Sequence, residues 1–322
     1  MLHNLVDQFW PATVDGLSLG AIYALVALGY TMVYGVLRLI NFAHSEIFMI
    51  GTVAALYTVT SIGVSAPLSG VSLVGMLLLL AVVGMVASGG AAVALEYIAY
   101  RPLRKRGASR LAALISAIGA SLFLQQLFAL QVIPKLFHTS QAGGFLPVHA
   151  FWVERTDVIT IGDFVVRNDK LLVVVGAILM MVALDQVVAR TKLGRGIRAT
   201  AQDPETAVLM GVNINRIVSA TFAIGGAMAG VAAALYVMRF EETRYDVGFL
   251  LGIKAFTAAV LGGIGNLRGA LVGGFVLGLI EMYGSAMFGS EWQHVVAFSV
   301  LVLVLMFRPT GILGESLQQA RV

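Results

Sequence analysis

Long runs of apolar residues with few or no charges recur along the whole chain, and they constrain its fold more than any other feature. The first run covers Gly16 to Leu37, and the third covers about Val71 to Tyr97. Helices of this length can cross about 30 Å of hydrocarbon. The alternating apolar and polar pattern of a membrane β-barrel is missing from the sequence. We therefore expect an all-α, polytopic integral membrane helical bundle, with residues 1–322 forming a single transmembrane domain.

Composition supports the same class, because 59% of the residues are hydrophobic and only 12% are charged. A soluble domain has far more charge than this. The apolar segments number nine, although 42–62 and the glycine-broken region near 262–265 are equally compatible with half-helices, so eight spans is a second prediction. The nine segments are residues 16–37, 42–62, 71–97, 111–133, 171–189, 217–237, 248–264, 269–288 and 292–306.

Basic residues between the segments predict the orientation. A dense cluster, Arg101 to Arg106, follows the third segment, and four basic residues fall between 190 and 198. Loops rich in Lys and Arg stay in the cytoplasm, so both regions are predicted to lie there. Threading the chain through nine segments then places the N-terminus outside, the loop at about 135–170 outside and the C-terminus inside.

A polar stretch from Thr191 to Val212 separates two apolar segments and carries signals for a short helix. Asp203 is a good N-cap and Pro204 suits the first helical position, while Gly211 can end the helix in a left-handed conformation. A helix of this kind cannot span the bilayer. It is predicted to lie at the cytoplasmic face within a loop at about 190–213.

A few ionisable residues fall within or next to the apolar segments. Glu281 lies deep within one, so it requires a buried partner, for which Arg239 and Lys254 are the candidates. His44 and Glu46 begin the second segment. We interpret them first as interfacial groups at a helix end, with a role in a substrate path as the alternative.

Two stretches resemble each other, one starting at Asn41 and one at Asn266, each leading into a helix rich in small residues. An internal duplication would place such segments beside a transport path. The alternative is that both are ordinary loop-to-helix junctions, where Asn often caps. On the first hypothesis, the candidate path residues are Asn41, His44, Glu46, Gly263, Gly265, Asn266 and Glu281.

Glycines spaced four residues apart indicate close helix packing. The pattern occurs at Gly16 and Gly20, at Gly226 and Gly230, and repeatedly between residues 265 and 278. Small residues at this spacing share one helix face and let two backbones approach.

Motifs for catalysis are missing from the sequence. It contains no phosphate-binding loop, no histidine spacing typical of a metal site and no cysteine. A nucleic-acid-binding role would need a basic surface, which the chain does not have. No catalytic or metal-binding residues are expected, and any nucleotide hydrolysis must occur on another chain.

Two long strings identify a family resemblance. Residues 29–44 (GYTMVYGVLRLINFAH) and 254–265 (KAFTAAVLGGIG) resemble the permease subunits of bacterial branched-chain amino acid ABC importers, specifically the first of the two paired permeases. The similarity covers roughly residues 14–313, with Ser45 where the family usually has Gly. The resemblance implies a multi-pass protein of the bacterial inner membrane, with alternating access as its mechanism.

The resemblance also implies where energy enters. ABC importer permeases carry a Glu-Ala-Ala-x-x-x-Gly signature that docks the ATPase, and residues 205–211 (ETAVLMG) are similar to it. A surface helix resting on lipid headgroups is the alternative, which the acidic start of the helix disfavours. The ATPase-coupling residues are then Arg195, Arg198, Asp203, Glu205, Ala207, Leu209, Met210 and Gly211.

Partners follow from the same resemblance: a second permease subunit in a heterodimer, two P-loop ATPase subunits that bind ATP, a periplasmic substrate-binding protein and the lipid bilayer. No cofactor is expected on this chain. Two other functions stay open. One is a permease for urea or short amides in the same family, and the other is an ion-coupled secondary transporter in which Glu281 and His44 titrate.

Overall fold

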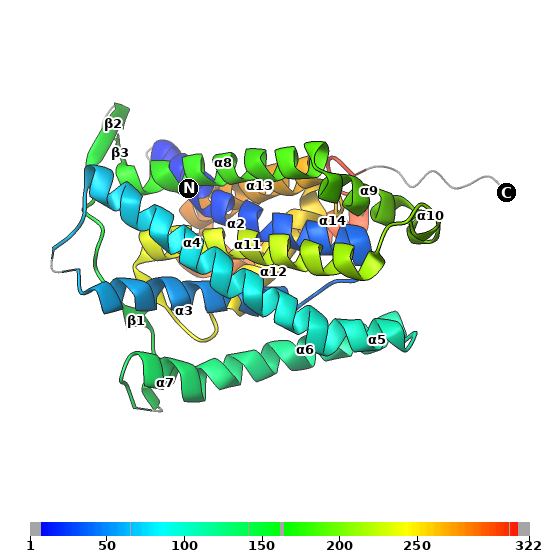
Figure 1. Cartoon of the computed structure of the whole chain (residues 1–322). Coiled ribbons are helices and arrows are strands. Elements are labelled where there is room, and N and C mark those ends of the chain that lie inside the picture. Colours follow the sequence, from blue (N-terminus) through cyan, green and yellow to red (C-terminus); the bar gives the residue numbers. More distant parts are fainter. Residues whose placement is uncertain (1–7, 65, 141, 162–163, 309, 315–322) are drawn as a thin grey trace.

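The structure is a computed structural model that describes residues 8–64, 66–140, 142–161, 164–308 and 310–314 of the 322-residue chain. Its helices form one bundle, and short strands gather at one end (Figure 1). The prediction of a polytopic helical membrane bundle is confirmed.

Eight helices in the described part of the chain are long and apolar enough to cross a membrane. They are α2 (Phe9–Leu37), α3 (His44–Ile62), α4 (Gly70–Leu95) extended by a π-helical turn (Glu96–Tyr100) and α5 (Arg101–Lys105), α6 (Arg110–Leu127) extended by a π-helical turn (Phe128–Val132) and α7 (Ile133–Leu136), α8 (Asn168–Arg190), α11 (Ile214–Phe240), α13 (Leu267–Phe288), and α14 (Gln293–Phe307) preceded by a 3-10 turn (Ser290–Trp292).

A ninth apolar helix, α12 (Val247–Gly262), is shorter. Its 16 residues reach about 24 Å at the usual rise per residue. It begins next to the strands and ends beside the C-terminal segment, where the Gly262 carbonyl accepts a hydrogen bond from Leu313 N (3.0 Å). Both predicted counts therefore have a basis: eight helices of spanning length, and a ninth that also runs from one end of the bundle to the other.

The centre of the bundle is built from helices with small residues. Helix α2 is buried along most of its length and lies between α11 and α13. Gly20 of α2 is so close to α13 that an added Cβ would lie 2.7 Å from the Gly274 carbonyl oxygen. Gly226 of α11 is equally close to α4, since its Cβ would lie 2.7 Å from the Ser88 carbonyl oxygen. The predicted role in close packing is confirmed for these two glycines. It is wrong for Gly265, which lies in the turn before α13 and whose added Cβ would meet no atom within 4 Å.

Strands mark one end, called here the strand end. β1 (Val148–His149) pairs antiparallel with β4 (Glu242–Thr243). This pairing joins the loop after α7 to the segment that follows α11. β2 (Asp157–Ile161) pairs antiparallel with β3 (Phe164–Arg167), and residues 162–163 between them lie outside the described residues. A 3-10 turn (Ala142–Phe145) completes this region.

The opposite end, called here the coupling end, holds the basic and polar loops. It contains α9 (Lys192–Gln202) and α10 (Pro204–Leu209), which project beyond the bundle in Figure 1. Arg104 donates to Asn215 Oδ1 (2.8 Å) and Arg38 donates to the Ala201 carbonyl (2.8 Å). The basic cluster after α4 and the polar loop after α8 therefore lie at the same end of the molecule.

Candidate functional site

A buried ion pair connects α12 to α13. Lys254 donates to Oε1 of Glu281, and the two side chains are 6% and 0% exposed. The same oxygen accepts from the Tyr23 hydroxyl (3.2 Å) and from Gln293 Nε2 (2.7 Å). The structure thus decides between the two predicted partners of Glu281 in favour of Lys254. Arg239 pairs instead with Asp15 and with Asp169 (3.3 Å).

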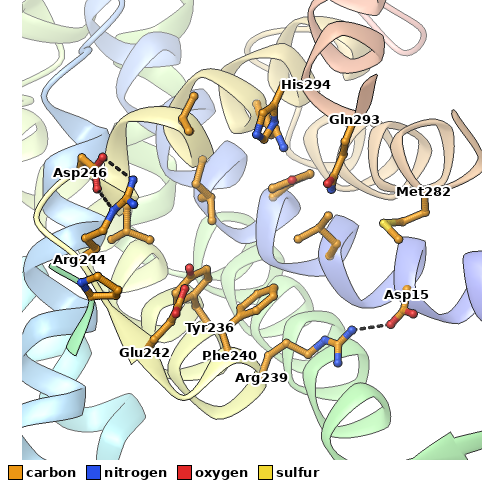
Figure 2. A pocket seen from close by; sticks show the side chains of 17 residues that line it. Asp15, Tyr236, Arg239, Phe240, Glu242, Arg244, Asp246, Met282, Gln293 and His294 are labelled. Carbon is orange, nitrogen blue, oxygen red and sulfur yellow. Dashed lines mark hydrogen bonds and ion pairs between the residues drawn. The ribbon is translucent and has the colours of Figure 1, made fainter. Parts of the chain in front are cut away.

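Beside this ion pair lies a cavity of about 530 Å³ at the strand end. Figure 2 shows side chains from α2, α11, α12, α13 and α14 around it, together with the segment that follows α11. Lys254, Tyr23 and Gln293 line its inner part, and Glu281 lies behind them. The apolar part of the wall includes Leu19, Val247, Leu250, Leu251 and Met282.

Charged side chains surround the outer part of the cavity as ion pairs. Arg239 reaches Asp15, and Arg244 reaches Asp246 with Nη2 2.6 Å from Oδ2 (Figure 2). The hydrogen bond to Asp246 raises the pKa of Arg244 above its ordinary value. Glu242 also lines the cavity and faces His149 (Oε2 to Nδ1, 3.6 Å). This surface suits a ligand that carries both signs of charge.

Sequence reasoning did not find this cavity. The segment 239–246 received no functional assignment from its sequence. A signal was present, since five charged residues fall within eight positions at the end of an apolar helix: Arg239, Glu241, Glu242, Arg244 and Asp246. Only the fold shows that they face α2, α12 and α14 around a common space.

Three predicted path residues lie in the interior at the start of α3. Asn41, His44 and Glu46 are 3%, 1% and 0% exposed. The interpretation of His44 and Glu46 as interfacial groups is therefore wrong, because the ring of His44 packs against Gly29 and Tyr30 inside the bundle. These residues do not line the cavity.

Glu46 connects α3 to α6 through one of its carboxylate oxygens. Ser121 donates to its Oε1 (3.1 Å), and so does Gln125 (3.4 Å). Oε2 of Glu46 is buried without a hydrogen-bond partner among the described residues, as is Nε2 of His44. The cluster holds two helices together within the bilayer region.

The remaining path candidates lie at the coupling end. Gly263 and Gly265 have positive φ angles of 108° and 101° and form the turn after α12. Asn266 caps α13 by accepting from Gly269 N (3.1 Å) and donates to the Leu313 carbonyl (2.8 Å). The structure therefore separates the predicted path residues into three places, of which only Glu281 adjoins the cavity.

The polar loop after α8 forms two helices, of which the sequence predicted one. Helix α9 was missed because Gly194 and Gly196 weaken its helical propensity. The available signal was Thr191, whose hydroxyl accepts from Gly194 N (3.0 Å) as an N-cap. Both glycines are buried, and Gly194 packs against the end of α8.

The predicted short helix α10 is present with its expected caps. Asp203 Oδ1 accepts from Glu205 N (3.0 Å) and Thr206 N (3.2 Å), and Gly211 has φ of +85°. The hydrogen bond from the Thr206 hydroxyl lowers the pKa of Asp203 below its ordinary value. Pro204 occupies the first helical position.

Exposure divides the predicted coupling residues. Leu209 and Met210 are 85% and 80% exposed, which is unusual for large apolar side chains. Arg195, Asp203, Glu205 and Gly211 are exposed as well. Ala207 is only 3% exposed, so of the predicted coupling residues it is the one whose side chain packs inward. Arg198 donates to the Val188 carbonyl and so also anchors α9 to α8.

Comparison with known proteins identifies the family of this chain. A family model described as "Branched-chain amino acid transport system / permease component" matches residues 12–305. The chain belongs to this permease family. The Pseudomonas aeruginosa protein "High-affinity branched-chain amino acid transport system permease protein BraD" is 42% identical over 309 residues, with 94% of each chain covered. LivH of Escherichia coli K12, whose name carries the same description, is 38% identical over 94% of each chain.

More distant relatives of this permease are also found. A LivH protein of Methanocaldococcus jannaschii, described as a probable branched-chain amino acid transport permease, is 27% identical over 90% of this chain and 88% of its own. Among solved structures, "PsaBC from Streptococcus pneumoniae in complex with Fab" covers 96% of this permease and 97% of that chain, with a TM-score of 0.47 and 12% identity.

Proposed function

We propose that this permease is the membrane subunit of an ATP-driven importer for branched-chain amino acids. The observation that carries the proposal is the match to the permease family over residues 12–305, which covers nearly the whole bundle. Relatives named for this transport are 38% and 42% identical across 94% of both chains. The protein is a transport subunit rather than an enzyme, and its substrate leaves chemically unchanged.

In the proposed assembly the coupling end faces the cytoplasm and carries the ATPase contact. Exposed Leu209 and Met210 at the tip of α10 would fill an apolar groove, with Arg195, Arg198 and Glu205 around it. Asp203 and Gly211 support this contact by capping the helix at its two ends. The sequence has no phosphate-binding loop, so ATP is proposed to bind two partner ATPase subunits and no cofactor is proposed here.

The strand end is proposed to face the periplasm, where a substrate-binding protein delivers the amino acid to the cavity. A second permease subunit completes the membrane part as a heterodimer. On this proposal the N-terminus lies outside and the C-terminus in the cytoplasm of a bacterial inner membrane, with the loop at 135–170 outside and the loop at 190–213 inside. Residues 1–322 are proposed to act as one transmembrane domain.

Alternating access accounts for the shape of the molecule. The cavity opens at the strand end, whereas the coupling end of α12 is closed by the C-terminal segment, with Ile312 N bonded to the Leu261 carbonyl (2.8 Å). ATP-driven movement of α10 would reverse this asymmetry. Closely packed glycine faces allow helices to slide with little side-chain rearrangement. Glu281 adjoins the present path, while Asn41, His44, Glu46, Gly263, Gly265 and Asn266 stay predictions for a conformation open at the coupling end.

The test is uptake by proteoliposomes that contain the permease pair with its ATPases and binding protein. Labelled leucine should accumulate in the lumen only when ATP is present on the side of the membrane where the ATPases lie. Labelled urea should not accumulate under either condition. Accumulation driven by a proton gradient without ATPase subunits would instead establish the ion-coupled alternative. Uptake of urea or a short amide in preference to leucine would establish the other alternative within the family.

A further inference from the structure

We propose that the inner part of the cavity is a subsite for the substrate's α-carboxylate. Lys254 binds the carboxylate, and Glu281 positions Lys254. The inference rests on the proposed function, because it assigns the part of an amino acid that the path recognises. It separates an amino acid from urea and from short amides, which have no carboxylate.

The first observation is the state of the Lys254 ammonium group. It lines the cavity, and its only hydrogen bond among the described residues goes to Glu281 Oε1. An ammonium group has three N–H donors, so two are free to bind a ligand. Its Nζ also lies 5.7 Å from the centroid of the Tyr23 ring, at the edge of cation–π range. A carboxylate that enters the cavity would meet a cation with unused donors.

The second observation is how firmly Glu281 is held. Its Oε1 accepts from Tyr23 and Gln293 as well as from Lys254, and these donors come from α2, α14 and α12. The neutral Tyr23 hydroxyl and Gln293 amide therefore stabilise the Glu281 carboxylate together with Lys254. Because Lys254 is not its only partner, the ammonium group can also bind a ligand. The ion pair also offsets the cost of placing two charges in the interior of the bundle.

The third observation is the balance of the lining. Arg239, Arg244 and Lys254 line the cavity together with Asp15, Asp246 and Glu242, and Glu281 lies behind Lys254. The presence of both signs of charge around one space suits a zwitterion. Glu242 has only His149 as an ion-pair partner among the described residues, which makes it the best placed acceptor for an ammonium group.

The apolar wall supplies the remaining contact. Leu19, Leu250, Leu251 and Met282 line the same space as Lys254. A branched alkyl side chain would bury its surface there, at roughly 25 cal/mol for each Å² removed from water. Urea gains nothing from such a wall. The arrangement thus matches carboxylate, ammonium and branched side chain together.

A single reporter cysteine tests the proposal, because the natural chain has none. Leu250→Cys places a thiol on the cavity wall, where the native side chain is 39% exposed. In membranes containing the full transporter, leucine should slow labelling of this thiol by a hydrophilic maleimide. Leucinamide and urea should not slow it. A matched reporter, Thr156→Cys on the exposed loop before β2, should label at the same rate with every compound.

Substitution of Lys254 completes the test. In the Leu250→Cys background, Lys254→Met combined with Glu281→Gln removes both charges, so no buried charge is left unpaired. The leucine concentration that gives half-protection should rise on the order of tenfold, because the variant loses the binding free energy of about one hydrogen bond to a charged group. Lys254→Arg with Glu281 intact should restore part of the protection.

Two outcomes would overturn the proposal: equal protection by leucine and leucinamide, or unchanged protection in the doubly substituted protein. The first comparison uses the native Lys254 and so remains decisive if the doubly substituted protein fails to reach the membrane. Failure of the proposed function is a separate result, because it would appear as absence of ATP-driven leucine uptake by the otherwise native transporter.

Discussion

The Glu281 carboxylate shows how one residue draws several helices together. Donors from α2, α12 and α14 meet its Oε1, although these helices are far apart in the sequence. Bringing a charge into a low-dielectric interior is costly, and the cost is offset only when partners are close and well oriented. At this scale, the ion pair with Lys254 is both part of the cavity and a condition for the bundle.

The effects of removing the Lys254 charge and the Glu281 charge on stability should depend on each other. We expect Lys254→Met or Glu281→Gln alone to destabilise the protein by about 3–5 kcal/mol, because each leaves a buried charge without its partner. The double substitution should cost less than either single one. The measurement is the apparent Tm of the detergent-solubilised protein by intrinsic fluorescence. Additive decreases in Tm would show that the two groups do not stabilise each other.

Helix α10 combines a rigid frame with an apolar tip. Its two ends are capped by Asp203 and Gly211, and its tip carries Leu209 and Met210 in exposed positions. Ala207 packs inward, so the helix is attached to the molecule by one face and presents the other.

Loss of the apolar tip should uncouple transport from ATP hydrolysis. Leu209→Asp together with Met210→Asp should abolish co-purification of the ATPase subunits and reduce leucine uptake to background, because charges cannot enter an apolar groove without loss of hydration. Gln202→Ser, an exposed substitution on the neighbouring helix, should retain both. Because these side chains are exposed, the amount of permease in the membrane should not change. Normal co-purification with the two aspartates would mean that the ATPase docks elsewhere.

Contact between α2 and α13 depends on glycine. A Cβ at Gly274 would lie 2.6 Å from Ala24 Cα, closer than packed atoms allow. Gly274→Val should therefore destabilise the bundle by roughly 1–3 kcal/mol or more. The measurement is the yield of monodisperse protein after detergent extraction, with Gly90→Val as the control, since a Cβ at Gly90 meets no atom within 4 Å. Equal yields would show that α13 can shift without cost.

The whole molecule is polarised between its two ends. The strands occupy one end of the bundle and α10 occupies the other (Figure 1). The cavity with its charged lining lies at the strand end, and the basic cluster after α4 lies at the coupling end. The hydrogen bond between Arg104 of α5 and Asn215 at the start of α11 brings together the basic cluster and the end of the polar loop, which the charge pattern alone assigned to the same side. Polarity of this kind is what directional transport requires.

Cysteine accessibility tests this polarity directly. Ala108→Cys and Gln202→Cys should react with a membrane-impermeant maleimide only when the cytoplasmic side is exposed, whereas Thr156→Cys should react in intact cells. The chain has no other cysteine to interfere, and all three native side chains are exposed. Labelling of residues 108 and 202 from opposite sides would contradict the proposed topology.

Local signals allowed much of the fold to be predicted. Apolar runs located the helices, and Asp203, Pro204 and Gly211 located α10, because capping and the burial of apolar surface depend on neighbouring residues. The predictions for His44 and Glu46 were wrong for a different reason. A residue at a helix start is usually near water, but here that start lies within the bundle.

The candidate site was less accessible to sequence reasoning. Glu281 was recognised as needing a partner, yet Lys254 and Arg239 were equivalent until the helices were placed. The cavity itself was missed, since its lining comes from five helices and two connecting segments. A cavity is a property of how elements leave space between them, and no single segment encodes it.

The sequence by itself determined that the chain is a helical membrane protein, where its long apolar helices lie and which family it belongs to. Hydrophobicity, charge bias and capping act over short stretches, and the bilayer permits few folds for such stretches. Only the tertiary structure decided that Glu281 meets Lys254, that Glu46 is buried and that charged side chains from distant segments enclose a cavity. These features depend on interhelical distances of a few ångströms, which side-chain packing sets across the whole bundle.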